Sequence, residues 1–193
     1  MITKRIVPRY TFFYSAGEFN WFFKKGGKEW GAKYGEKSKD NLFNARDIEK
    51  VTDRIDKPGR KRNHYFHEWK AAIALLKEYG FLSLVGQYSA KGAAHRNKVE
   101  IVRQRVSDDV WEAINKPVLN AGKAAGLPDL FVYHRENEKE WFFAEVKGPT
   151  DRIGNKQEAK SKLLDDAAGK CVSCLIELKR TTDPFTPPRN LRD

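Results

Sequence analysis

Glu145 and Lys147 lie two residues apart at the end of the apolar segment "WFFAEVKG", residues 141–148. Side chains alternate between the two faces of a strand, so a strand here would place both charged groups on one face. A second apolar segment, "DLFVYH", begins at Asp129, and the charged loop "RENEKE" separates the two segments. An antiparallel hairpin about this loop would set Asp129 opposite Glu145 or Lys147, on the same face. The spacing therefore predicts two carboxylates and an amine at one end of an apolar sheet.

Two carboxylates within a few ångströms of each other repel unless a cation lies between them. Mg²⁺ fits such a position, because it is bound by one or two carboxylates together with waters and phosphate oxygens. A metal there would polarise a phosphodiester and lower the pKa of a bound water, which Lys147 would orient or deprotonate. The pattern thus predicts phosphodiester hydrolysis. The competing interpretation is a solvated ion pair at the end of a strand.

Two segments in order, "GLPDLFVY" (126–133) and "FFAEVKGPTDRIGNKQ" (142–157), closely resemble the virus-type replication-repair nuclease (VRR-NUC) family. This family of the PD-(D/E)xK superfamily includes stand-alone phage proteins and the C-terminal module of the Fanconi-associated nuclease. The resemblance is strong over residues 126–157 and extends from about 64 to 180. It implies a stand-alone, phage-like nuclease with a restriction-endonuclease-like α/β core, in which helices flank a mixed sheet.

The resemblance also implies roles for individual residues. Asp129 and Glu145 would be metal ligands, joined by the backbone carbonyl of Val146, and Lys147 would be the catalytic lysine. Gln157, near the start of the following helix, would contact the site. The implied cofactor is Mg²⁺, for which Mn²⁺ would substitute, and no small-molecule cofactor is expected.

The family also carries a glutamate on its first helix, and Glu68 is the best candidate for it. Glu68 shares its helical face with Ala72 and Leu75, so partial burial is expected. Glu78 is the competitor, and an ordinary solvent-facing glutamate is the alternative. Arg152, in the loop after the second strand, would shape that loop or contact the substrate.

The surrounding elements are expected to form an α/β sandwich around a mixed sheet. "HYFHEWKAAIALLKEYG" (64–80) predicts a helix that ends at Gly80. "SDDVWEAINKPVLNAG" (107–122) predicts a capped helix interrupted at Pro117. The remaining predictions are strands over 81–88, 98–106 and 171–178 and a helix over 155–169.

The polar loop "SAKGAAHRNK" (89–98) supplies Lys91, Arg96 and Lys98 as candidates for contacts with a nucleic-acid backbone, with a plain mobile loop as the alternative. The CVSC pair, Cys171 and Cys174, allows a metal or redox role. Because it lies in a buried strand pattern and no second Cys pair exists, reduced core thiols are the favoured interpretation.

The chain of 193 residues has a net charge of +11, and residues 1–63 hold 16 basic and 8 acidic residues, or +8. Such a balance favours a polyanionic partner, although cationic surfaces also serve solubility. We therefore expect a basic extension over 1–63 that binds nucleic acid or dimerises and adds affinity rather than chemistry. The nuclease domain would span 64–180 and an irregular tail 181–193.

Within this extension, "FFKKGGKEW" predicts a hairpin turning at Gly26 and Gly27, and residues 38–56 predict a helix before a break at 57–63. Its many aromatic residues either stack on exposed bases or form the core of a small accessory sheet, and we favour the core.

Together these features predict a metal-dependent endonuclease for branched or structured DNA, of the Holliday-junction or flap type. A homodimer is expected, since resolving a junction needs two incisions at symmetry-related phosphates. The alternatives are a non-cleaving nucleic-acid-binding or inhibitory protein, or a nuclease for RNA or specific duplex sequences. With no apolar run of membrane-spanning length and no signal-peptide pattern, we expect a cytoplasmic protein (in the host cell if phage-encoded) without a membrane partner.

Overall fold

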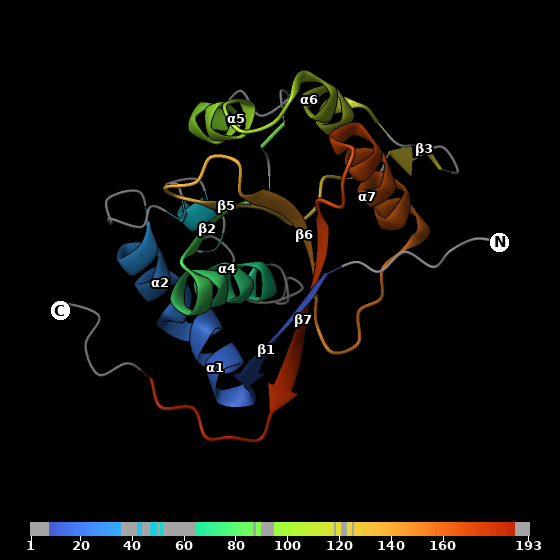
Figure 1. Ribbon diagram of the computed structural model, residues 1–193. Helices are drawn as coiled ribbons and strands as arrows, with labels where there is room; N and C mark the ends of the chain where they lie inside the picture. Colours follow the sequence, from blue (N-terminus) through green and yellow to red (C-terminus); the bar gives the residue numbers. More distant parts are fainter. Residues whose placement is uncertain are drawn as a thin grey trace.

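A mixed five-stranded sheet with helices on both faces forms the centre of the molecule (Figure 1). The computed structural model describes residues 8–35, 42–43, 47–49, 51, 65–86, 88–89, 95–117, 119–120, 123–124 and 126–187. The strand order in the sheet is β1-β7-β6-β5-β2. The strands are β1 (Arg9–Ser15), β2 (Phe81–Val85), β5 (Leu130–His134), β6 (Trp141–Lys147) and β7 (Ser173–Thr181), and a short separate hairpin joins β3 (Leu119–Asn120) to β4 (Lys123–Ala124).

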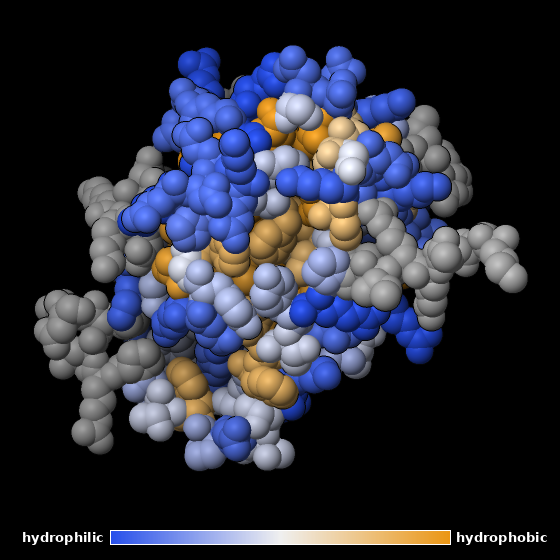
Figure 2. All heavy atoms as spheres, viewed as in Figure 1, coloured by the Kyte–Doolittle hydropathy of each residue, from blue (hydrophilic) through white to orange (hydrophobic). Residues whose placement is uncertain are grey.

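The helices divide between the two faces of this sheet. Around the first face lie α1 (Ala16–Trp21), the π-helical η1 (Phe22–Gly26), α2 (Gly27–Tyr34) and α4 (Phe66–Tyr79). On the other side lie α5 (Arg96–Arg103), α6 (Asp108–Asn115) and α7 (Asn155–Ala168). Coverage from both sides explains why the central strands are almost continuously apolar. Figure 2 shows that hydrophilic side chains cover most of one face of the molecule, with hydrophobic ones visible between α4 and α5.

Strands β5 and β6 form the predicted antiparallel hairpin. Leu130 pairs with Ala144, so Asp129 immediately precedes the paired residues and lies beside Glu145. This is the first of the two registers that the sequence allowed. The helix predicted over 64–80 is also confirmed: α4 ends at Gly80, whose left-handed φ of 74° is typical of a glycine C-cap.

The N-terminal segment belongs to the same sheet and core as the rest of the chain. β1 runs parallel to β7, beginning with Arg9 opposite Leu175. On the helical side, the rings of Phe22 and Phe66 lie 5.3 Å apart, edge to face. The division predicted at residue 63 therefore does not separate residues 9–34 from the core. The predicted helix over 38–56 lies largely, and the break at 57–63 wholly, outside the described residues.

The hairpin predicted at Gly26 and Gly27 is wrong, because a continuous helical segment runs through both glycines. Gly26 is needed for packing: a Cβ there would lie 2.2 Å from the ring of Trp21. Most aromatic side chains of the segment are buried and cannot stack on bases, as the favoured interpretation held. They belong to β1 of the main sheet and to the helical segment after it, and not to an accessory sheet. The buried ones are Phe12, Tyr14, Trp21, Phe22 and Trp30.

The strand predicted over 98–106 is also wrong, because α5 occupies most of that segment. Its two buried residues, Lys98 and Val102, are four residues apart, as one face of a helix requires. The next helix was predicted correctly. Ser107 caps α6 by accepting a hydrogen bond from the Val110 amide (3.4 Å), and α6 ends before Pro117.

The C-terminal part follows the prediction closely. α7 precedes β7, and after Thr181 residues 182–187 form no regular element. The thiols of Cys171 and Cys174 are free. Cys174 is buried in β7 as predicted, and burial raises the pKa of its thiol to about 12, which makes it unreactive. Cys171 is exposed and precedes β7, so the prediction of a core thiol is wrong for it. Within the described residues, none of the helices has the length and apolar character to span a membrane.

Candidate active site

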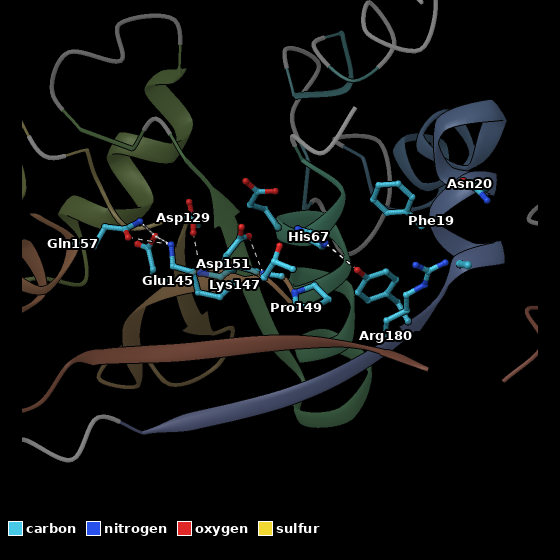
Figure 3. Close-up of a pocket in the computed structure, with 16 residues that line it drawn as sticks. Phe19, Asn20, His67, Asp129, Glu145, Lys147, Pro149, Asp151, Gln157 and Arg180 are labelled. Carbon is cyan, nitrogen blue, oxygen red and sulfur yellow. Dashed lines mark hydrogen bonds and ion pairs between the residues drawn. The ribbon is translucent and has the colours of Figure 1, made fainter. Parts of the chain in front are cut away.

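A cavity of about 770 Å³ opens where β5 and β6 meet the N-terminal ends of α4 and α7 (Figure 3). All five predicted catalytic residues line it: Asp129, Glu145 and Lys147 from the hairpin, Glu68 from α4 and Gln157 from α7. Val146, predicted to contribute its carbonyl, lines it as well. The structure therefore brings together every residue to which the sequence assigned a chemical role.

Backbone and side-chain hydrogen bonds fix the three charged groups of the hairpin. One carboxylate oxygen of Asp129, Oδ2, accepts a hydrogen bond from the Val146 amide at 2.8 Å. The Lys147 ammonium donates to Glu145 Oε1 at 2.9 Å, and both side chains are about nine-tenths buried, with exposures of 12% and 10%. Lys147 thus neutralises part of the charge of Glu145, whereas Asp129 forms no ion pair with a cation among the described residues.

Gln157 connects this group to the start of α7. Its side-chain oxygen accepts hydrogen bonds from the Gly154 amide (3.0 Å) and from Lys147 Nζ (3.1 Å). Its side-chain nitrogen donates to Glu145 Oε1. Because Gln157 is the third residue of α7 and closes the helix N-terminus, the helix itself fixes how Lys147 and Glu145 point.

The two carboxylates of the hairpin sit in an environment that disfavours negative charge. Burial is the largest cause that raises the pKa of Glu145 to about 7; the charge of Asp129 adds to it and Lys147 opposes it. Burial also raises the pKa of Asp129, against the opposing effects of the Val146 amide and Lys147. The repulsion between the two ionised carboxylates would be relieved by a cation bound between them.

Glu68 adds a third acid, partly buried, to the cavity. Burial, followed by the charge of Asp129, raises the pKa of Glu68 to about 7. Its Oε2 atom is inaccessible to solvent and has no hydrogen-bond partner among the residues that the structure describes. The competing Glu78 is exposed in the last turn of α4, far along the helix from this end. The geometry therefore places Glu68, and not Glu78, at the site.

The residues present fit a divalent cation held by two carboxylates and a carbonyl. In the described part of the chain, no three acidic, histidine or cysteine side chains converge closely enough to form a metal site by themselves. The predicted set does not require three, because Mg²⁺ keeps several waters and uses few protein carboxylates. A bound cation would offset the charge of Glu68, whose Oε2 has no hydrogen-bond partner among the described residues, and the repulsion between Asp129 and Glu145.

The residues predicted to contact nucleic acid do not line the cavity. Arg96 and Arg152 are exposed, at the start of α5 and in the loop after β6. The prediction for Lys98 is wrong: it is buried, forms an ion pair with Asp47 (2.7 Å) and donates to the Val85 carbonyl (2.7 Å). Lys91 lies outside the described residues.

Sequence reasoning missed the opposite side of the cavity. It is lined by Tyr14, Phe19 and Asn20 from β1 and α1, by His67 beside Glu68, and by Arg180 near the end of β7. Of these, His67 alone had a local signal, since it precedes the helical glutamate. The others reach the site only because β1 pairs with β7, a contact between segments more than 160 residues apart.

The family model of the VRR-NUC domain matches residues 71–175, more than half of the 193-residue chain. The chain belongs to the VRR-NUC family. This is a family of nucleases, and its members have the PD-(D/E)xK type of fold, with which the mixed sheet and flanking helices agree. Searches among curated proteins and among solved structures found no match.

The matched segment contains the hairpin and Gln157, and it begins three residues after Glu68. It excludes β1, α1 and α2, and Arg180 lies beyond its end. Membership in the family therefore indicates a nuclease acting on DNA. The N-terminal wall of the cavity lies outside the segment that carries this assignment.

Proposed function

We propose that this VRR-NUC protein is a divalent-metal-dependent endonuclease that hydrolyses phosphodiester bonds in branched or structured DNA. The observation that carries the proposal is the convergence of Asp129, Glu145 and Lys147 in one cavity, with Lys147 bonded to Glu145 at 2.9 Å. An ordinary surface ion pair would be solvated, whereas both side chains of this one are largely buried. Burying charge at a cavity wall is costly and indicates a functional site.

In this proposal Asp129, Glu145 and the Val146 carbonyl hold Mg²⁺ or Mn²⁺. When bound, the metal would polarise the scissile phosphate and lower the pKa of a coordinated water. Lys147 lies beside these ligands, so its ammonium would orient the attacking water and stabilise the charge that develops on the phosphate. Gln157 holds both Lys147 and Glu145 and so acts as a positioning residue.

Branched or structured DNA is proposed as the substrate from the resemblance to stand-alone members of the family. A four-way junction offers two phosphates related by twofold symmetry, and a homodimer would present two equivalent sites to them. The net charge of +11 favours binding to such a polyanion.

The test is a cleavage panel on end-labelled linear duplex, flap, four-way junction and RNA of matched sequence. We expect cleavage with Mg²⁺ or Mn²⁺, none in EDTA, and a preference for flap or junction. Asp129→Asn should abolish cleavage, and Glu78→Gln, a change at an exposed position, should not. Cleavage that persists in EDTA or in Asp129→Asn would overturn the proposal. Metal-independent binding without cleavage would instead support the non-cleaving alternative.

A further inference from the structure

The cavity has two chemically different ends. Figure 3 shows Asp129, Glu145, Lys147 and Gln157 gathered at one end and Phe19, Asn20 and Arg180 at the other. The second end is built by α1 and by the end of β7, where β1 and β7 lie side by side. None of its three residues belongs to the segment that matches the family model. What this end binds is therefore not given by the family.

Phe19 presents a fixed aromatic ring to this end. Its ring lies 5.0 Å from the ring of Phe66 and 5.0 Å from that of Phe23, both edge to face, which holds it in place. It is nevertheless only half-buried and lines the cavity. A partly exposed aromatic ring that lines a cavity can stack on a nucleic-acid base.

Asn20 and Arg180 supply the polar groups. Both are exposed, and among the described residues neither has a hydrogen-bond or ion-pair partner. A guanidinium binds phosphate oxygens, and a side-chain amide can pair with the edge of a base. A stacking ring, an amide and a guanidinium together make the set of groups that recognises one unpaired nucleotide.

Charge and size limit how much nucleic acid can enter. Four carboxylates line the cavity (Glu68, Asp129, Glu145 and Asp151), against the two cations Lys147 and Arg180. Since Lys147 is bonded to Glu145, Arg180 is the cation left for a phosphate at the far end. A volume of about 770 Å³ is that of a small-ligand pocket and suits a nucleotide rather than a duplex.

We infer that Phe19, Asn20 and Arg180 form a subsite for one unpaired nucleotide next to the scissile phosphate, so that the enzyme cleaves beside single-stranded DNA. Phe19 would stack on the base, Asn20 would contact its edge, and Arg180 would bind the adjoining phosphate. The inference rests on the proposed nuclease function and narrows its substrate to flaps, overhangs and frayed junction arms. It also gives residues of the N-terminal segment a direct role in substrate selection.

The experiment measures kcat/KM of the full-length protein with Mg²⁺ on a flap, and on the same flap with one abasic residue at successive positions around the cut. For the wild type, kcat/KM should fall about tenfold when the abasic residue is at one particular position, because the missing base removes the stacking partner of Phe19. Phe19→Leu, which keeps an apolar side chain against Phe66, should lose about tenfold on the intact flap. On the abasic flap, kcat/KM of this variant should fall almost no further, because the substitution and the removal of the base abolish the same contact.

Arg180 is tested by binding in the inactive Lys147→Met background. Arg180→Gln should weaken binding to the flap and reduce the slope of log K against log salt by about 0.7, the contribution of one phosphate on a single strand. The matched controls are Lys179→Gln on the opposite face of β7 and Phe13→Leu on β1, whose ring is 59% exposed. In the same inactive background, Lys179→Gln should leave the affinity and the salt slope unchanged. In the active protein, Phe13→Leu should leave the kcat/KM ratio between intact and abasic flap unchanged.

The possible failures are distinguishable. A wild type that cleaves no DNA with metal refutes the proposed function before any subsite variant is compared. A wild type that cleaves, but whose Phe19→Leu and Arg180→Gln variants behave like the two controls, refutes the subsite alone. Equal cleavage of blunt duplex and flap, or no position sensitive to base removal, refutes it as well.

Discussion

Glu68 offers the sharpest test of the site, because one substitution should raise stability and remove activity. Burial and the charge of Asp129 raise its pKa from 4.5 to about 7. One pKa unit corresponds to about 1.4 kcal/mol, so ionising Glu68 in the folded, metal-free protein costs about 3 kcal/mol above pH 7. Glu68→Gln keeps the shape of the side chain and removes the charge.

The sign follows from proton binding. Between pH 4.5 and 7 the folded protein holds the Glu68 proton more tightly than the unfolded chain does, so wild-type stability falls as the pH rises through this window. The stability of Glu68→Gln should not fall in this window, because the variant has no carboxylate to ionise at this position. In EDTA its free energy of unfolding should equal the wild-type value near pH 4.5 and exceed it by about 3 kcal/mol at pH 8. Urea unfolding followed by circular dichroism at both pH values measures the difference.

Metal should cancel most of this difference, since a cation that offsets the charge of Glu68 stabilises the wild type more than the variant. At a metal concentration 100 times the Kd, the wild type would gain about 2.7 kcal/mol. Cleavage should be lost in Glu68→Gln. The control Glu78→Gln should change stability by less than about 0.5 kcal/mol under both conditions. If Glu68→Gln is instead less stable than wild type at pH 8 in EDTA, the carboxylate serves mainly to close the start of α4, and the reasoning is refuted.

Four further outcomes are expected. Asp129→Asn can keep its hydrogen bond from the Val146 amide, so it should fold normally and lose cleavage; a misfolded variant would show that the carboxylate is structural. Lys147→Met should retain DNA binding and lose cleavage, and retained cleavage would exclude a catalytic lysine. Lys160→Met removes a buried ammonium that donates to three carbonyls at the end of α6 (2.7, 2.9 and 2.9 Å), and should cost about 2–4 kcal/mol in urea unfolding, whereas the exposed Lys162→Met should cost almost nothing. Deleting residues 1–63 should prevent folding, because it removes β1 and the aromatic rings packed on α4; a soluble, cooperatively folded deletion variant would contradict this.

The part of the site that could be predicted from sequence is the part that is local along the chain. Asp129, Glu145 and Lys147 lie on one hairpin, and strand alternation alone puts them on one face. Gln157 follows at the start of the next helix, so its approach to the hairpin needs only a short connection. The VRR-NUC motif and the strand pattern therefore selected the same three residues. The register of the hairpin in the structure is one of the two that were predicted.

The errors arose where a distant contact overrides a local pattern. The pair Gly26–Gly27 has the composition of a turn, but Gly26 is required by the ring of Trp21 within a helical segment. Residues 98–106 alternate in polarity like a strand. Lys98 nevertheless lies inside the protein, because its ammonium forms an ion pair with Asp47 and donates a hydrogen bond to the Val85 carbonyl. Neither partner can be identified from the sequence near the residue itself.

The uneven charge of the molecule has a different meaning once the cavity is known. The chain as a whole is strongly basic, but four of the six charged side chains that line the cavity are acidic. Basic residues elsewhere attract DNA over a distance, whereas the acidic cavity repels a phosphate unless a divalent cation is present. Binding and cleavage should therefore respond differently to metal: DNA should bind without it, and the scissile phosphate should enter the site only with it. Counting charge along the sequence therefore indicates a polyanionic partner, whereas the acidic lining of the cavity becomes visible only in the fold.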